Sequence, residues 1–144
     1  MFLPSKNNVL PNTPIYPGSH FTWGEATKNG KRPLEDLIIN DRLIVSAGQI
    51  EKTIVLTAMA LDLVRQKLGN HPIHINSWYR PARDNKSVGG SQYSRHLFGD
   101  GVDFRSDYYL PQQIAKLLEP THNGGFHAYS KFCHIDWRGH KARW

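Results

Sequence analysis

The chain has 144 residues, of which 39% are apolar and 21% charged, which suits one domain with one hydrophobic core. Lysine and arginine outnumber aspartate and glutamate by 18 to 12, and this excess favours an acidic partner such as nucleic acid, anionic lipid or an anionic cell-wall polymer. This composition is too apolar for a disordered chain. No apolar run reaches the ~20 residues of a membrane span, and the single cysteine excludes an intramolecular disulfide.

Residues 1–20 contain four prolines and few apolar residues, which predicts an extended arm without a helix, followed by a domain over 21–144. The arm has no basic stretch followed by an apolar one, so it does not resemble a secretory signal. Phe21 and Trp23 lie two residues apart, as on one face of a short strand. Residues 33–39 fit either a short helical piece or a loop.

The strongest helix signal lies within residues 46–68. Gly69 and Asn70 end the pattern, and Pro72 prevents the helix from resuming. We expect a scaffold helix packed on a sheet. Apolar residues recur at spacings of three and four and therefore share one face of it: Ile50, Ile54, Ala58, Leu61, Val64 and Leu68.

The sequence of the second half of the chain predicts several strands and one further helix. The order of these elements indicates an α+β fold with a mostly antiparallel sheet. The elements expected in chain order are a strand over 73–78, a polar loop over 84–91, a strand over 101–106, a helix over 111–119 and a hairpin with strands near 126–130 and 132–137.

Two histidines and an aspartate form a candidate metal site. His96 and Asp103 are seven residues apart across a glycine-bearing turn, and His134 lies near the end of the chain. Neutral imidazole and carboxylate both suit zinc, and three protein ligands with an open fourth position are the catalytic arrangement. We therefore predict that these three residues hold one zinc ion.

The last strand makes a specific prediction about its two faces. Side chains alternate along a strand, so His134 and Asp136 share one face, while Cys133 and Ile135 share the other, apolar face. Cys133 is therefore expected to be a small buried hydrophobe. Asp136 has two possible roles: it is a general base for the attacking water, or it orients a metal ligand.

Several motifs together resemble the peptidase M15 family of zinc D-alanyl-D-alanine carboxypeptidases and peptidoglycan endopeptidases, which share a fold with hedgehog signalling domains. They are Ser-Trp-Tyr-Arg at 77–80, Ser-x-His-x-x-Gly-x-x-x-Asp at 94–103 and Phe-Cys-His-Ile-Asp-Trp-Arg at 132–138. The resemblance covers about residues 20–140. It implies the zinc ligands already chosen, a substrate-binding Arg80, and a Ser94 that bonds to substrate or fixes its loop.

One departure from the family pattern concerns the proton acceptor. Many members place a carboxylate three residues before the last histidine, whereas this chain has Lys131 there. We take Asp136 as the first substitute for the base and His127, in the preceding strand, as the second. A third possibility is a chain that binds zinc without catalysing hydrolysis.

The leading hypothesis is a monomeric zinc peptidase that cuts an amide bond in bacterial peptidoglycan peptide, one involving D-alanine. The alternative is a non-catalytic zinc-binding module of the same fold. A nucleic-acid binder is disfavoured because no recognition helix or RNA-binding aromatic motif is present. Without a signal segment, the expected setting is a phage or prophage lytic enzyme that is released at lysis or carried in the virion.

Overall fold

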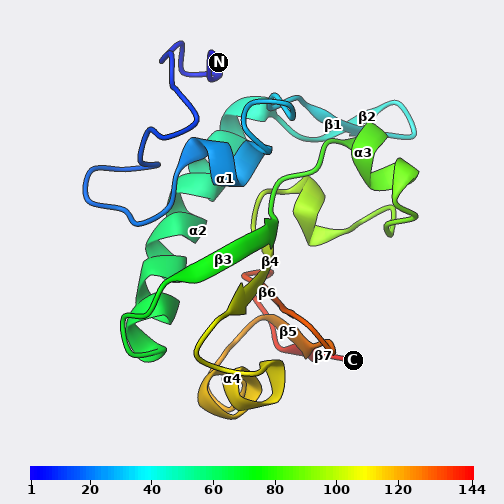
Figure 1. The fold of residues 1–144 in the computed structure, drawn as a ribbon. Coiled ribbons are helices and arrows are strands. Elements are labelled where there is room, and N and C mark those ends of the chain that lie inside the picture. Colours follow the sequence, from blue (N-terminus) through cyan, green and yellow to red (C-terminus); the bar gives the residue numbers. More distant parts are fainter.

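A five-stranded sheet with the order β3-β4-β6-β5-β7 forms the centre of the computed structural model, which describes residues 1–144 (Figure 1). Its strands are antiparallel except that β7 runs parallel to β5. This arrangement confirms the expected α+β fold and mostly antiparallel sheet. The strands span Ile73–Ser77 (β3), Gly101–Ser106 (β4), Gly125–Ala128 (β5), Cys133–Asp136 (β6) and Ala142–Arg143 (β7).

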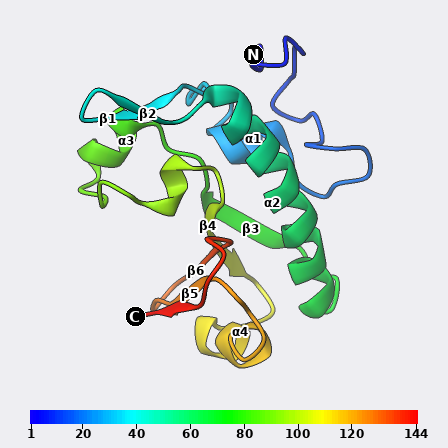
Figure 2. The same ribbon diagram turned by 180° about the vertical axis from the view of Figure 1, so that it is seen from behind.

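The scaffold helix α2 spans Ala47–Lys67 and lies beside β3 in both views (Figures 1 and 2). Ser46 caps it, and Gln49 completes a reciprocal capping box. All six residues of the predicted apolar face are at most 7% exposed, which confirms that face. A second helix, α4, spans Pro111–Leu118 as predicted. None of the helices is both long and apolar enough to cross a membrane.

The predicted strand at residues 21–23 is wrong, because the short helix α1 (Trp23–Thr27) begins at Trp23, with Thr22 as its N-cap. The Thr22 side chain accepts a hydrogen bond from the Glu25 backbone N–H, and the Glu25 carboxylate accepts one from the Thr22 backbone. This reciprocal cap is a stronger local signal for a helix than two aromatic residues spaced two apart are for a strand.

Two further segments differ from the sequence interpretation. Residues 33–39 fit a helical piece or a loop, yet their end forms β1 (Leu37–Ile39), which pairs with β2 (Arg42–Val45). The pair turns through Asn40 and Asp41, both at positive φ, which suits a tight hairpin. The expected polar loop at 84–91 begins instead within the helix α3 (Ala82–Ser87).

The N-terminal arm has no helix and packs on the domain. Its buried residues Leu3, Val9 and Ile15 join the main core. Asp62 on α2 fixes the arm further, because its carboxylate accepts hydrogen bonds from the Tyr16 hydroxyl, the Ser19 hydroxyl and the His20 backbone.

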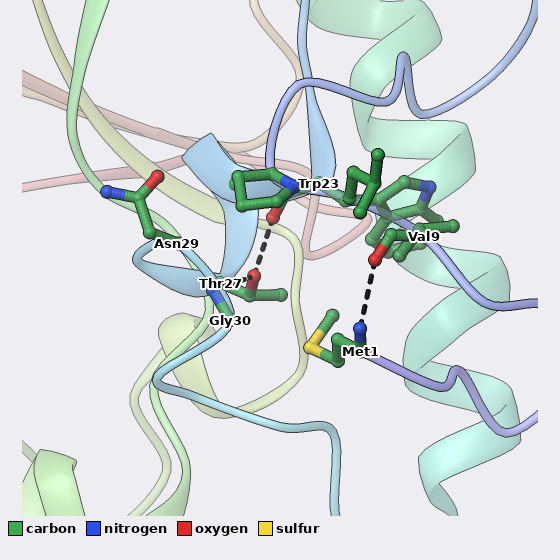
Figure 3. Close-up of a pocket in the computed structure, with 9 residues that line it drawn as sticks. Met1, Val9, Trp23, Thr27, Asn29 and Gly30 are labelled. Atoms are coloured by element: carbon green, nitrogen blue, oxygen red, sulfur yellow. Dashed lines mark hydrogen bonds between the residues drawn. The ribbon is translucent and has the colours of Figure 1, made fainter.

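The arm and α1 enclose a cavity of about 270 Å³ (Figure 3). The Thr27 hydroxyl donates to the Trp23 carbonyl at its wall. No charged side chain and none of the candidate zinc ligands line this cavity. It therefore offers no group suited to hydrolysis or metal binding.

The apolar face predicted for the last strand is confirmed. Cys133 and Ile135 of β6 are fully buried in the main core. Burial raises the pKa of the Cys133 thiol to about 12, which keeps it protonated and unreactive. Cys133 is thus a small interior hydrophobe, as expected.

Candidate metal centre

The three candidate zinc ligands lie together at the sheet and the turn beside it. His96 belongs to the short 3-10 turn η1 (Arg95–Leu97), Asp103 to β4 and His134 to β6. Asp103 and His134 face each other directly in the antiparallel β4–β6 pair, so their side chains emerge on the same side of the sheet. One candidate ligand atom from each of the three residues lies within 4.8 Å of the other two.

A backbone carbonyl holds the imidazole of His96 in one orientation. Its Nδ1 lies 2.7 Å from the Trp78 carbonyl oxygen, which can only accept, so Nδ1 carries the proton. Nε2 therefore keeps its lone pair and points toward Asp103, with 3.2 Å between Nε2 and Asp103 Oδ2. A buried histidine fixed in this way is prepared to donate Nε2 to a metal.

In His134 the two ring nitrogens have the opposite roles to those in His96. Its Nε2 lies 2.8 Å from Oδ2 of Asp136, and its Nδ1 lies 2.9 Å from Oδ1 of Asp103. With Nε2 bound to the Asp136 carboxylate, Nδ1 is the atom left for a metal. A carboxylate that binds the far nitrogen of a histidine is the usual support of a metal ligand.

The chemistry of this donor set fits a zinc ion. Two imidazole nitrogens and one carboxylate oxygen are zinc ligands of ordinary type. Burial opposes ionisation of Asp103, but its contacts with His134 and His96 outweigh that effect and lower the pKa of this carboxyl. Asp103 is thus deprotonated at neutral pH, which is the state that a metal ligand requires. These three residues are therefore the ones that would hold a zinc ion.

Asp136 is enclosed on all sides. It is fully buried, and Oδ1 accepts hydrogen bonds from the Gly125 backbone at 2.9 Å and from Arg138 Nε at 2.9 Å. Arg138 Nη2 donates to Oδ2 at 2.7 Å, so the guanidinium binds both carboxylate oxygens. A Cβ at Gly125 would lie 2.2 Å from Oδ2, so only glycine fits there.

The position of Asp136 favours a role in orienting a metal ligand over a role as the general base. Its carboxylate is saturated by His134, Arg138 and Gly125, and it does not line the pocket that contains the ligands. A general base must reach the water that it deprotonates. Asp136 instead contacts the side of His134 that faces away from Asp103, where it can orient the ring.

Replacing Asp136 with asparagine is accordingly expected to weaken zinc binding by about 10–100-fold, because this is the usual effect of losing the carboxylate behind a histidine ligand. Competition with a chromogenic chelator measures the affinity. Asp107→Asn, at a carboxylate that is 74% exposed, is the matched control and should leave the affinity unchanged. Unchanged zinc affinity combined with lost turnover in Asp136→Asn would instead make Asp136 the base.

The ligands lie in a pocket of about 350 Å³ that Arg80 and Ser94 also line. Ser94 Oγ accepts a hydrogen bond from the His96 backbone at 3.3 Å, so Ser94 fixes the turn that carries this ligand. Arg80 is half-buried and forms no side-chain hydrogen bond or ion pair, and its buried Nε has no partner. Burial lowers the pKa of Arg80, and the nearby Asp103 offsets part of that effect.

His127 and Lys131 do not line this pocket. His127 is the cross-strand neighbour of His134, but its ring stacks on Trp144 with centroids 5.5 Å apart and planes inclined by 7°. Trp144 does line the pocket. This geometry does not favour His127 as the base, and Asp103 is the only carboxylate in the pocket wall.

The sequence interpretation missed several residues of the pocket. Arg138 is detectable in principle, because it lies two residues after Asp136 on the same face of an extended segment. Strand alternation also places Phe132 on the face of His134, whereas Tyr93, Tyr129 and Trp144 have no sequence signal, since turns and the pairing of β7 with β5 bring them to the pocket. The missed residues include Arg138, Tyr93, Tyr129 and Trp144.

Comparison with known proteins gives two matches. The sequence profile of the family described as Peptidase M15 matches residues 35–136, which include Arg80 and all three candidate ligands. A zinc D-Ala-D-Ala carboxypeptidase of Streptomyces albus G is 30% identical to this chain over 82 residues. The aligned segment covers 57% of this chain and 31% of that carboxypeptidase.

Proposed function

This chain belongs to the peptidase M15 family, and we propose that it is a zinc-dependent peptidase that hydrolyses an amide bond in the peptide of bacterial peptidoglycan. The observation that carries the proposal is the set of three ligand atoms within 4.8 Å of one another, in a pocket that also contains a half-buried, unpaired arginine. The related carboxypeptidase of Streptomyces albus G supports a bond that involves D-alanine.

In the proposed mechanism, His96, Asp103 and His134 hold the metal. A zinc ion bound there supplies a Lewis acid that polarises the scissile carbonyl and lowers the pKa of water. Asp136 and Arg138 keep the His134 ring in place, and the Trp78 carbonyl does the same for His96. These supports set the positions of the ligands before substrate binds.

Arg80 is proposed to bind the negative charge of the substrate. A guanidinium remains charged at every physiological pH and donates several hydrogen bonds in a fixed plane. Since the side chain of Arg80 has no hydrogen-bond partner within the protein, a terminal carboxylate or the oxyanion that forms during hydrolysis would provide one. Ser94 lines the same pocket and is proposed to bond to substrate in addition to holding the turn at His96.

A second candidate function is a non-catalytic zinc-binding module. One observation favours it: no carboxylate other than Asp103 lines the pocket, and Lys131 occupies the position where many relatives carry the base. Such a module would bind zinc and wall peptide without cleaving the peptide. All the side chains concerned come from one chain, so neither function requires a second copy.

Mass spectrometry of muropeptides separates the two functions. Purified peptidoglycan incubated with the zinc-loaded protein should yield fragments that differ from the starting peptides by hydrolysis of one amide bond, and the fragment masses identify that bond. Removal of zinc by a chelator should abolish the products, and added zinc should restore them. Zinc binding without any new fragment would establish the non-catalytic module. Activity on intact cell walls would also fit the proposed setting of a phage or prophage lytic enzyme.

A further inference from the structure

A second pocket, of about 410 Å³, lies between the β1–β2 hairpin and α3. Figure 1 shows these two segments at the same end of the molecule. Gly90 lines both this pocket and the one that contains the zinc ligands, so the two pockets meet at the loop that follows α3. The zinc pocket therefore has a second hollow as its neighbour across this loop.

The floor of the second pocket is tied to the metal centre. Leu37, Ile39 and Leu97 form a small buried cluster that is separate from the main core. Leu97 directly follows the ligand His96 in η1, so the apolar floor and the ligand share one rigid turn. A group bound on this floor would lie at a fixed position relative to the metal.

The boundary between the two pockets is thin and firmly held. Asn85 is 4% exposed, and its Nδ2 donates to the Ser91 carbonyl at 2.8 Å. A Cβ at Gly90 would lie 2.1 Å from Asn85 Oδ1, so no larger residue fits at the boundary. The boundary between the two pockets therefore carries no side chain at Gly90.

The lining of the second pocket suits a peptide better than a sugar. Five of its eleven lining residues are aliphatic, and no aromatic residue is present to stack on a sugar ring. The polar groups are neutral amides and the cation Lys86, with no carboxylate among them. Ile38 at the rim keeps 58% of its surface exposed. An extended peptide with small aliphatic side chains and a carboxylate matches these groups, because apolar contacts and one positive charge recognise it.

We propose that this second pocket binds the part of the wall peptide that extends beyond the residues held at the zinc ligands. The proposal rests on the proposed function and deepens it, because a substrate that occupies both pockets must be longer than a terminal dipeptide. The protein should therefore prefer longer peptides, and the second pocket should determine this preference.

Ile38→Asp tests the proposal, since it places a negative charge on an apolar rim that faces an acidic peptide. Leu43→Asp is the matched control: Leu43 pairs with Ile38 across the hairpin and is 60% exposed, but it does not line the pocket. Ala82→Trp, which fills the pocket from the first turn of α3, is an independent variant. Thermal melting checks that each variant is folded.

The readout is kcat/KM for a terminal dipeptide substrate and for a complete wall pentapeptide. Ile38→Asp and Ala82→Trp should lower the value for the pentapeptide about tenfold or more and that for the dipeptide by less than about twofold, as expected when one pocket contact is lost. Leu43→Asp should change neither value. Equal values for wild type and both pocket variants on the pentapeptide would overturn the proposal while the peptidase function stands.

A wild type that cleaves neither peptide nor purified peptidoglycan would overturn the proposed peptidase function, and the pocket is then tested by binding alone. Titration calorimetry with the intact pentapeptide should show binding to the wild type and to Leu43→Asp, and about tenfold or more weaker binding to Ile38→Asp and Ala82→Trp. Absence of binding to the wild type, or equal binding to all four proteins, would refute the second pocket as a peptide site.

Discussion

Replacing His134 with alanine is expected to weaken zinc binding by about 10²–10⁴-fold. Apparent zinc binding by a complete protein site contributes about 10–16 kcal/mol, and this variant removes one of three protein ligands. Metal analysis after dialysis should then find little zinc in the variant. Because the metal binds the folded state, a chelator should lower the melting temperature of the wild type and leave that of His134→Ala nearly unchanged.

His127→Ala is the matched control for this experiment. His127 lies directly across from His134 in the β5–β6 pair, so both variants remove one imidazole from adjacent strands. Only His134 contributes to the cluster of candidate ligands, and His127→Ala should keep its zinc. Full zinc retention in His134→Ala would refute the ligand assignment. Loss of turnover in a zinc-loaded His127→Ala would restore His127 as a candidate base.

Replacing Arg80 with lysine is expected to lower kcat by about 10²–10³-fold, with a smaller effect on KM. A donor directed at an oxyanion contributes mainly in the transition state, and its removal has an effect of this size. Lysine keeps the charge but cannot donate two parallel hydrogen bonds from a planar group. Steady-state kinetics on the wall peptide identified by mass spectrometry measure both constants.

Arg83→Lys is the control for the Arg80 variant. Arg83 lies three residues after Arg80, its side chain is 71% exposed, and it does not line the zinc pocket. The control should retain wild-type kcat, and both variants should bind one zinc ion. Wild-type turnover in Arg80→Lys would contradict the proposed role. A rise in KM alone would mean that Arg80 binds the ground state and the transition state equally.

The sequence alone predicts the parts of this protein whose signals are local and repeated. The apolar residues of α2 and its C-cap recur through about five turns, so their shared face is detectable without any tertiary contact. Alternation in β4 and β6 likewise indicates which side chains enter the core. The ligand types suit zinc, but the spacing between His96 and Asp103 is a weak signal by itself, and the prediction depends on the surrounding motifs that resemble the M15 family.

The local errors have identifiable causes. In α1, the capping residues Thr22 and Glu25 decide the conformation, whereas the apolar spacing suggests a strand. In the β1–β2 hairpin, Asn40 and Asp41 supply the two positive φ angles that close the turn. Each signal was present in the sequence, but it depended on one or two residues and competed with a longer pattern.

Only the tertiary structure decides how the metal centre is supported. The sequence leaves Asp136 either as a base or as a support of a ligand, because strand alternation fixes its face but not its partners. The structure encloses Asp136 between His134, Arg138 and Gly125 and stacks Trp144 on His127. These contacts depend on strand register and on the parallel addition of β7, which join segments without a shared local pattern. The same holds for the second pocket, since β1 and α3 are distant in sequence and meet only after the chain has folded.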